Sequence, residues 1–199
     1  MVRFIIAYAM QKNMTRKLAS EILTAMFVYV GISSECSLEQ LRHAKVIRNT
    51  KEIFDYVILP VLKKYSGKFI RTSGDSFLMT FTSPTDAVHC GVELQKTVLK
   101  YNKKEEVPMM MRVAIHRGEV IHGDEWDHGE AVDIAAVIAN YAKEGQVVFS
   151  EAVFSEMDKS LVSANLLRIP PLFKNRLPII LYKPGWQNRL PKKLYKALI

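Results

Sequence analysis

The sequence predicts an α+β domain, with a ferredoxin-like βαββαβ core and several added elements. Three observations lead to this fold class. First, apolar residues alternate at strand spacing in several short segments and recur at helical spacing in the segments between them. Second, the predicted order is β-α-α-β-β-α-β-β-α-β-α-β-β, in which β-α-β units are joined by hairpins. Third, a chain of 199 residues that is 49% hydrophobic and 24% charged is long enough for one domain with a substantial core.

The first strand and the first helical region are predicted from apolar runs. Residues 24–30 are apolar almost throughout, with aromatic and β-branched side chains, which is typical of a strand buried on both faces. Residues 38–65 have apolar residues at helical spacing, so we expect helix there. Pro60 lies inside this segment and predicts a kink or a break between two helical pieces.

A hairpin and a long helix follow. Residues 68–72 and 77–81 predict two strands, and the tight turn between them contains Gly74 and Asp75. The next helix opens at Ser83 and Pro84, because serine is a favoured N-cap and proline is tolerated in the first helical turn.

The second half of the chain alternates strands with helices. Larger apolar side chains recur at every second position from Met111 to Ile115, which predicts a strand at residues 111–116. Gly118 and Gly123 bracket a second short strand, and residues 129–142 are rich in small and apolar residues, as in a helix packed closely on a sheet. The remaining predicted elements are a strand at 146–150, a helix at 151–157 and two final strands at 166–169 and 178–182.

The charge distribution suggests how the chain is organised. We expect one domain at residues 22–184, an N-terminal extension at residues 1–21 and a basic tail at residues 185–199. Residues 159–199 hold nine of the 28 basic residues and none of the 20 acidic ones. Such asymmetry is found in solvated tails and in proteins that bind nucleic acid or anionic surfaces. Aromatic side chains for stacking on bases are sparse there, so nucleic acid is not the expected partner.

Apolar runs and cysteines bear on the compartment. No apolar run reaches the roughly 18 residues that a membrane-spanning helix needs, so we expect no span. Cys36 and Cys90 form neither a metal-binding spacing nor a redox pair, which is consistent with a reducing cytoplasm. Cys90 lies on the apolar side of the helix that opens at Ser83, where we expect it to be buried.

Several motifs occur in the order and at the spacing of one known family. They are the strand Ala25-Met-Phe-Val-Tyr-Val30, the hairpin at residues 69–81 with its Gly-Asp tip, the helix at residues 83–95, the strand Val113-Ala-Ile-His-Arg-Gly-Glu-Val120, and the helix and strand that begin at Gly129 and Gly145. Together they resemble the class III adenylate/guanylate (nucleotidyl) cyclase catalytic domain over residues 22–183. The resemblance implies the class III nucleotidyl cyclase fold.

The resemblance also implies a chemistry. In this family a ribose 3′-hydroxyl attacks the α-phosphate of a nucleoside triphosphate, and a 3′,5′-cyclic nucleotide and pyrophosphate are formed. Two divalent cations, Mg²⁺ or Mn²⁺, offset the developing charge. Two aspartates hold the metals, an asparagine and an arginine lie on a later helix, and a base-reading pair completes the site across a dimer interface. The implied partners are a nucleoside triphosphate and a second cyclase domain, in a homodimer or a heterodimer.

One of the two implied metal ligands is present. Asp75 matches the aspartate of the Gly-Asp tip, although an aspartate is also common in a turn for its geometry alone. Tyr29 stands where the first strand should carry the other aspartate, and a phenol that keeps its proton is a poor ligand for Mg²⁺. We therefore expect a weakened site for a divalent cation.

The base-reading positions are also altered. Arg71 matches the base-reading lysine of adenylate cyclases, and its guanidinium favours a carbonyl acceptor on the base. It is equally consistent with an arginine on the surface of a strand. The acidic partner position falls at Trp126, with Glu125 and Asp127 beside it. Adenine specificity is therefore not supported.

The later helix departs from the family at two positions. Asp133 stands at the asparagine position and Val137 at the arginine position. Valine donates no hydrogen bond to a phosphate, and the loss of one such donor typically lowers the rate by about 10²–10³. Asp133 would repel a triphosphate unless it bound metal, and it also suits the first turn of a helix.

Three histidines lie between these motifs. His116, His122 and His128 are spaced six residues apart, so they share no single helix face and do not suggest a joint metal site.

The sequence is consistent with three functions. The first is a catalytically degenerate cyclase-like protein, a pseudoenzyme that acts as a regulatory or dimerisation module in cyclic-nucleotide-type signalling. The second is an active, divergent cyclase in which Arg71, Asp75 and Asp133 are the working residues. The third is a protein that uses its basic C-terminal part to bind nucleic acid or an anionic surface.

Overall fold

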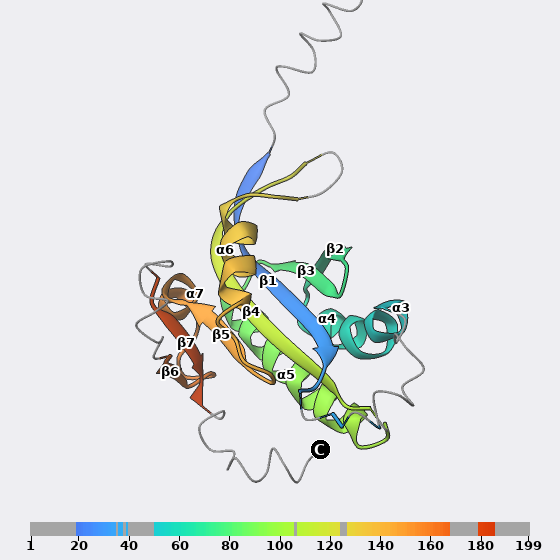
Figure 1. Ribbon diagram of the computed structural model, residues 1–199. Helices are drawn as coiled ribbons and strands as arrows, with labels where there is room; N and C mark the ends of the chain where they lie inside the picture. Colours follow the sequence, from blue (N-terminus) through green and yellow to red (C-terminus); the bar gives the residue numbers. More distant parts are fainter. Residues whose placement is uncertain are drawn as a thin grey trace, which may run out of the picture.

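The computed structural model describes residues 19–34, 36–37, 39, 50–105, 107–123, 127–167 and 179–185. Its centre is a seven-stranded sheet with the strand order β2-β3-β1-β4-β5-β7-β6. All neighbouring strands are antiparallel except β4 and β5, which are parallel. Helices lie on both faces of this sheet (Figure 1).

The elements follow one another in nearly the predicted order. They are β1 (Ser20–Ile32), α3 (Thr50–Ile53), the π-helical segment η1 (Phe54–Ile58), α4 (Leu59–Lys64), β2 (Lys68–Ser73), β3 (Ser76–Phe81), α5 (Pro84–Asn102), β4 (Met109–Ile121), α6 (Glu130–Ala139), β5 (Val147–Ser150), α7 (Glu151–Glu156), β6 (Ala164–Leu166) and β7 (Leu181–Pro184).

The prediction of a ferredoxin-like core is confirmed. β1, the helical segment from α3 to α4, β2, β3, α5 and β4 form the βαββαβ unit, and its four strands lie side by side in the order β2-β3-β1-β4. Of the added elements, β5, β7 and β6 extend the sheet beyond β4, α6 covers its second face, and α7 lies beside α5 on the first face.

The core is divided between the two faces of the sheet. On one face η1, α4, α5 and α7 bury the largest apolar cluster, which includes Phe77, Phe81 and Phe149. On the other face α6 packs on β1 and β4 through small residues such as Ala131 and Ala135. Figure 1 shows α5 and α6 on opposite sides of β4. β1 is buried between these layers, as its apolar sequence predicts.

The predicted interruption at Pro60 takes the form of a π-helical segment. η1 ends immediately before α4, in which Pro60 occupies the first turn. Proline has no backbone N–H and its ring crowds the preceding turn, so the helix cannot continue with regular α-helical hydrogen bonds at this point. The long helix α5 begins as predicted, since the Ser83 side chain accepts a hydrogen bond of 3.2 Å from the backbone N–H of Asp86.

One predicted boundary is wrong. We expected two strands separated at Gly118, whereas β4 is continuous from Met109 to Ile121. Residues 117–121 pair with the first residues of β1, which begins at Ser20, and this pairing continues the strand through the glycine. A Cβ at Gly118 would lie 3.6 Å from the Ala131 Cβ, which is ordinary van der Waals contact between the strand and α6.

The two strands that follow α7 shift from their predicted ranges. β6 and β7 overlap the predicted strands at 166–169 and 178–182, and residues 168–178 lie outside the described part of the chain. Within the described residues, no helix is both long enough and apolar enough to cross a membrane. Cys90 is fully buried in α5, as predicted.

Candidate functional site

The hairpin between β2 and β3 places Asp75 at the end of the sheet. Ser73 pairs with Ser76 across the hairpin. The two turn residues are therefore Gly74 and Asp75, and Gly74 has a positive φ of 60°, as the first position of a type II′ turn requires. The Asp75 side chain is exposed, and its carboxylate lies 3.4 Å from the Ser76 hydroxyl that donates to it. The backbone carbonyl of Asp75 accepts a 3.0 Å hydrogen bond from the Val30 N–H, which fixes the turn beside β1.

Tyr29 lies next to this turn and contacts an arginine. It pairs with Ser76 of β3 on one side and with Arg112 of β4 on the other. The guanidinium carbon of Arg112 lies 4.2 Å from the centre of the Tyr29 ring, which is a cation–π contact. Arg112 Nε is buried and has no hydrogen-bond acceptor among the described residues. Arg112 was not predicted as a site residue, although a charged side chain between Met111 and Val113 in an otherwise apolar strand was a signal.

These residues do not fit a divalent cation. Asp75 offers one carboxylate, but Tyr29 offers a neutral phenol and Arg112 adds a permanent positive charge against that phenol. Mg²⁺ and Mn²⁺ prefer several anionic or carbonyl oxygen ligands and are repelled by a fixed cation at short range. In the described part of the chain, no group of three or more His, Cys, Asp or Glu side chains could hold a metal ion.

Helix α6 presents two further candidate residues on its exposed side. Gly129 precedes the helix with a φ of 122°, and a Cβ at this position would lie 2.9 Å from the Glu119 backbone oxygen. The helix therefore starts in close contact with β4. Asp133 and Val137 follow one turn apart, both exposed, and the Val137 residue keeps 41% of its surface accessible. An aliphatic side chain this exposed, beside a carboxylate, provides no hydrogen-bond donor for a phosphate.

The candidate base-reading residues are only partly described. Arg71 lies half-buried on β2, where the register pairs it with Leu78 after a bulge that follows Phe69. Glu125 and Trp126 lie outside the described residues. A contact between these residues and Arg71 therefore stays a prediction.

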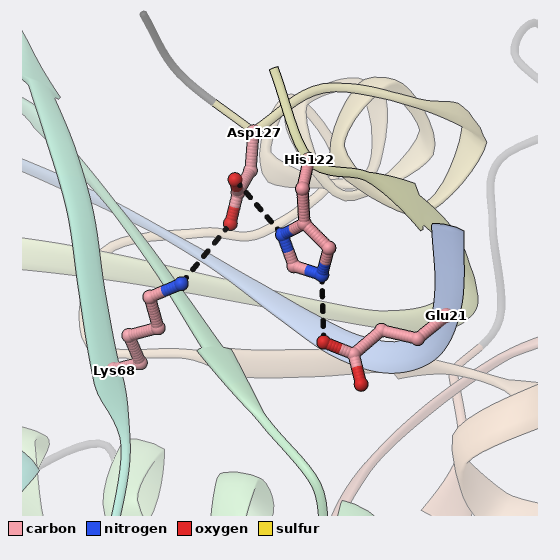
Figure 2. Close-up of polar contacts among 4 residues, drawn as sticks. All are labelled: Glu21, Lys68, His122 and Asp127. Atoms are coloured by element: carbon pink, nitrogen blue, oxygen red, sulfur yellow. Dashed lines mark hydrogen bonds and ion pairs between the residues drawn. The ribbon is translucent and has the colours of Figure 1, made fainter. Parts of the chain in front are cut away.

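A polar cluster occurs at the other end of β1, and the sequence analysis did not predict it (Figure 2). The His122 ring lies between two carboxylates, with Nδ1 3.0 Å from Asp127 Oδ1 and Nε2 2.7 Å from Glu21 Oε1. Lys68 Nζ lies 3.6 Å from the second Asp127 oxygen, at ion-pair distance but too far for a hydrogen bond. We call Glu21, Lys68, His122 and Asp127 the His122 cluster.

The His122 cluster joins three segments that are distant in sequence. Glu21 belongs to the start of β1, Lys68 is the first residue of β2, and His122 and Asp127 flank the loop after β4. Hydrogen bonds to Asp127 and then to Glu21 raise the pKa of His122, because both carboxylates favour the protonated ring. Asp127 is buried, and a buried negative charge is unfavourable unless it is paired. Lys68 and the protonated His122 ring compensate it.

The other two histidines are not members of this cluster, although His128 directly follows Asp127 in the chain. His116 is buried, and its Nδ1 lies 2.8 Å from the Ser150 hydroxyl. Burial lowers the pKa of His116, and the charge of Glu130 partly opposes this shift. His128 is exposed and its backbone forms a bridge with Ile121. His116 is therefore buried away from the His122 cluster, whereas His128 lies exposed next to it in the chain.

A carboxylate secures the end of β1 beyond Tyr29. Glu144, in the turn before β5, accepts hydrogen bonds from the Ser34 backbone N–H at 2.7 Å and from the Ser34 and Ser33 hydroxyls at 3.1 and 3.3 Å. These bonds hold the residues after β1 against the turn that follows α6. The chain that follows Tyr29 is thereby held at two places, at Val30 by the Asp75 turn and at Ser33 and Ser34 by Glu144.

The sequence of the chain is similar to the sequences of known cyclase domains. A family model described as the adenylate and guanylate cyclase catalytic domain matches residues 19–166. The putative adenylate cyclase 3 of Rhizobium meliloti is 27% identical over 146 residues, which cover 72% of this chain and 24% of that protein. The serine/threonine-protein kinase pkn2 of Myxococcus xanthus is 32% identical over 104 residues, which cover 51% of this chain and 12% of that protein. The matched region is therefore a small part of these relatives.

A structural comparison gives the same fold. The crystal structure of the adenylyl cyclase CyaB from P. aeruginosa superposes with a TM-score of 0.65 and 14% sequence identity. The match covers 84% of this chain and 95% of that one. At this sequence identity, the comparison shows that the two chains share a fold. The roles of the side chains that differ from the family pattern have to be inferred from their own contacts.

Proposed function

The chain belongs to the adenylate and guanylate cyclase catalytic domain family, and we propose that it is a catalytically degenerate member that acts as a regulatory or dimerisation module in cyclic-nucleotide-type signalling. The proposal applies to this domain. The activities of the longer relatives, of which it spans a small part, belong to those proteins. We also propose a cytoplasmic location, which rests on the absence of a disulfide or metal pattern in its cysteine spacing.

The proposal rests on what the family reaction demands. Negative charge builds up on the α-phosphate and on the attacking and leaving oxygens, and divalent cations and hydrogen-bond donors must offset it. When bound, such cations would polarise the phosphate and orient the attack. In this chain Asp75 is the one matching carboxylate, and Val137 supplies no donor.

The observation that supports degeneracy most directly is the contact between Tyr29 and Arg112. The guanidinium lies 4.2 Å from the ring, so the position that should hold an anionic ligand instead holds a phenol covered by a cation. Substituting the tyrosine without moving the arginine would still leave a positive charge beside any incoming metal ion. Two independent features therefore oppose catalysis, one in the metal site and one on α6.

A role in dimerisation is supported by the surface of α6. Cyclase domains of this family dimerise and bind nucleoside triphosphates. In this chain α6 keeps Val137 exposed on its outer side, one turn from Asp133. A second copy of this chain or another cyclase domain would cover this side chain in a homodimer or a heterodimer.

A cyclase assay tests the proposal. The purified protein is incubated with ATP, GTP, CTP or UTP and with Mg²⁺ or Mn²⁺, and cyclic nucleotide is measured by mass spectrometry. We expect no product above the protein-free background under conditions in which an active family member gives product. A rate that depends on Asp75 would contradict the proposal.

The second candidate, an active divergent cyclase, is favoured by one observation. Asp75 is exposed and held beside β1 by the bond from Val30, so one carboxylate remains available for a cation. If this candidate is correct, product forms with at least one nucleotide, and Asp75→Asn lowers the rate by about 10²-fold or more. The same assay therefore separates the two candidates.

A further inference from the structure

The His122 ring contacts a carboxylate through each of its two nitrogens. Nε2 lies 2.7 Å from Glu21 Oε1, and Nδ1 lies 3.0 Å from Asp127 Oδ1 (Figure 2). An ionised carboxylate only accepts hydrogen bonds, and a neutral imidazole has a single N–H to donate. Imidazole is also a stronger base than a carboxylate. Both contacts are therefore hydrogen bonds only while the ring carries its second proton.

The two carboxylates differ in how they tolerate the loss of that proton. The Asp127 side chain is only 11% accessible, and Lys68 Nζ lies 3.6 Å from its other oxygen. The Glu21 side chain is 54% accessible, so water can solvate its charge. A buried carboxylate gains more from a hydrogen bond than an exposed one does. The neutral ring should therefore keep its N–H on Nδ1, towards Asp127, and present an unprotonated Nε2 to Glu21.

The contact that is lost lies at the start of β1. Residues 19–22 are exposed, so little burial of apolar surface holds them to the domain. Backbone pairing joins them to the end of β4, where Glu21 pairs with Val120 and the His122 N–H donates to the Ala19 carbonyl at 2.8 Å. The side-chain contact between Glu21 and His122 adds a second link at the same place. Without it, the strand end is attached by its backbone bonds.

The charges around the ring come from three segments in the part of the chain that the structure describes. Glu21 belongs to β1, Lys68 to β2 and Asp127 to the loop after β4. With the protonated ring these charges balance, and without the proton one negative charge is in excess. Two further titratable groups are close in the chain, namely Glu119 on β4 and His128 after Asp127, and both are exposed. The ring itself must therefore be followed directly in any test.

We infer that His122 is a pH-dependent link at the start of β1: the protonated ring joins Glu21 to Asp127, and loss of the proton releases Glu21 while the bond to Asp127 remains. The inference goes beyond the proposed function and does not depend on it, because it concerns the attachment of a strand. The bonds to Asp127 and Glu21 raise the pKa of His122 above its ordinary value of 6.5. The link is therefore lost as the pH rises through that higher value.

Nitrogen-15 NMR of the whole chain tests which ring nitrogen keeps the proton. Both nitrogens of His122 are followed from pH 5.5 to pH 9. We expect a doubly protonated ring at low pH and a neutral ring with its proton on Nδ1 at high pH. Glu21→Gln should lower the midpoint of this titration by about half a pH unit, as expected when one exposed ion pair is lost. A neutral ring protonated on Nε2, or an unchanged midpoint in the variant, would overturn the inference.

Hydrogen exchange of the His122 amide tests the attachment of the strand, because this amide is bonded to Ala19. After correction for the intrinsic rate, its protection in the wild type should fall about two- to fivefold between pH 6 and pH 9, the range expected for an exposed ion pair. Glu21→Gln should show no such fall. Glu119→Gln loses the same charge from a neighbouring exposed position and should behave like the wild type.

Two results of the exchange experiment would contradict the inference. One is a protection of the wild-type amide that does not change with pH. The other is an equal loss of the pH dependence in Glu21→Gln and Glu119→Gln, which would show that the overall charge of this region matters and the contact with His122 does not. Thermal melting of each variant shows whether it is folded, and the two wild-type measurements test the inference without any variant.

Discussion

At the residue scale, the His122 cluster shows how one titratable ring joins three segments. The His122 ring donates to both Asp127 and Glu21 when it is protonated, and its side chain keeps 28% of its surface accessible. The folded state raises the pKa of this ring, so the cluster's contribution to stability is fully present below the unfolded value, near 6.5. That contribution is lost as the pH rises through the higher folded value.

The first prediction concerns His122→Gln. Glutamine keeps a polar group but cannot carry the charge, so the variant should lose more stability at pH 5.5 than at pH 8.5 relative to the wild type. The measurement is the melting temperature as a function of pH. Burial lowers the pKa of His116, which acts in the opposite direction. The wild type and the variant share His116, so the difference between their melting temperatures at each pH excludes its contribution.

The control for this prediction lies near the end of β4, the strand that leads into His122. Glu119 is exposed on β4, so Glu119→Gln removes a carboxylate close to the cluster without removing a partner of His122. Its melting curve should follow the wild type at every pH. A pH-independent effect of His122→Gln would show that the ring contributes by packing and not by its charge.

At the scale of single elements, glycine sets how α6 begins. Gly129 and Gly74 both have positive φ values, 122° and 60°. They differ in surroundings, because a Cβ at Gly129 would approach the Glu119 backbone oxygen to 2.9 Å, whereas a Cβ at Gly74 would have no neighbour within 4 Å. The two positions therefore separate the steric effect of a side chain from the effect of φ alone.

We expect Gly129→Ala to destabilise the fold more than Gly74→Ala. The hairpin variant should cost about 1 kcal/mol, the usual penalty for a left-handed alanine. The α6 variant should cost at least about 2 kcal/mol, since a backbone oxygen cannot move aside without shifting β4. Urea unfolding measures both, and equal costs would mean that the start of α6 adjusts freely.

At the scale of the whole molecule, the exposed side of α6 bears on assembly. Val137 keeps 41% of its surface accessible on the helix that packs against β1 and β4. Leu161, 64% accessible, provides a matched exposed aliphatic residue after α7. If α6 forms the dimer contact, only the first of the two side chains becomes buried on association.

Sedimentation equilibrium of Val137→Glu and Leu161→Glu tests the dimer. We expect the first variant to raise the dimer dissociation constant at least about tenfold, because a carboxylate buried without a partner is strongly unfavourable. The second should associate like the wild type. A wild type that stays monomeric at all concentrations would remove dimerisation from the proposed function.

Across the whole molecule, most of the architecture was predictable from local patterns. Strand alternation, the Ser83 cap and the Gly74 turn are properties of neighbouring residues, and each appears in the structure. The division at Gly118 was wrong, because a glycine that ends a strand looks the same in sequence as one inside a continuous strand. The pairing partner of residues 117–121, which decides between these cases, lies nearly a hundred residues away.

The sequence by itself determined the order of the elements, the cyclase family and the altered positions Tyr29, Asp133 and Val137, because periodicity and motif spacing are written along the chain. Only the tertiary structure decided which side chains meet. The contact of Arg112 with Tyr29 and the bond from His122 to Glu21, 101 residues apart, both arise from the pairing of β1 with β4. Strand register between distant segments sets these contacts, and register depends on the packing of the whole sheet.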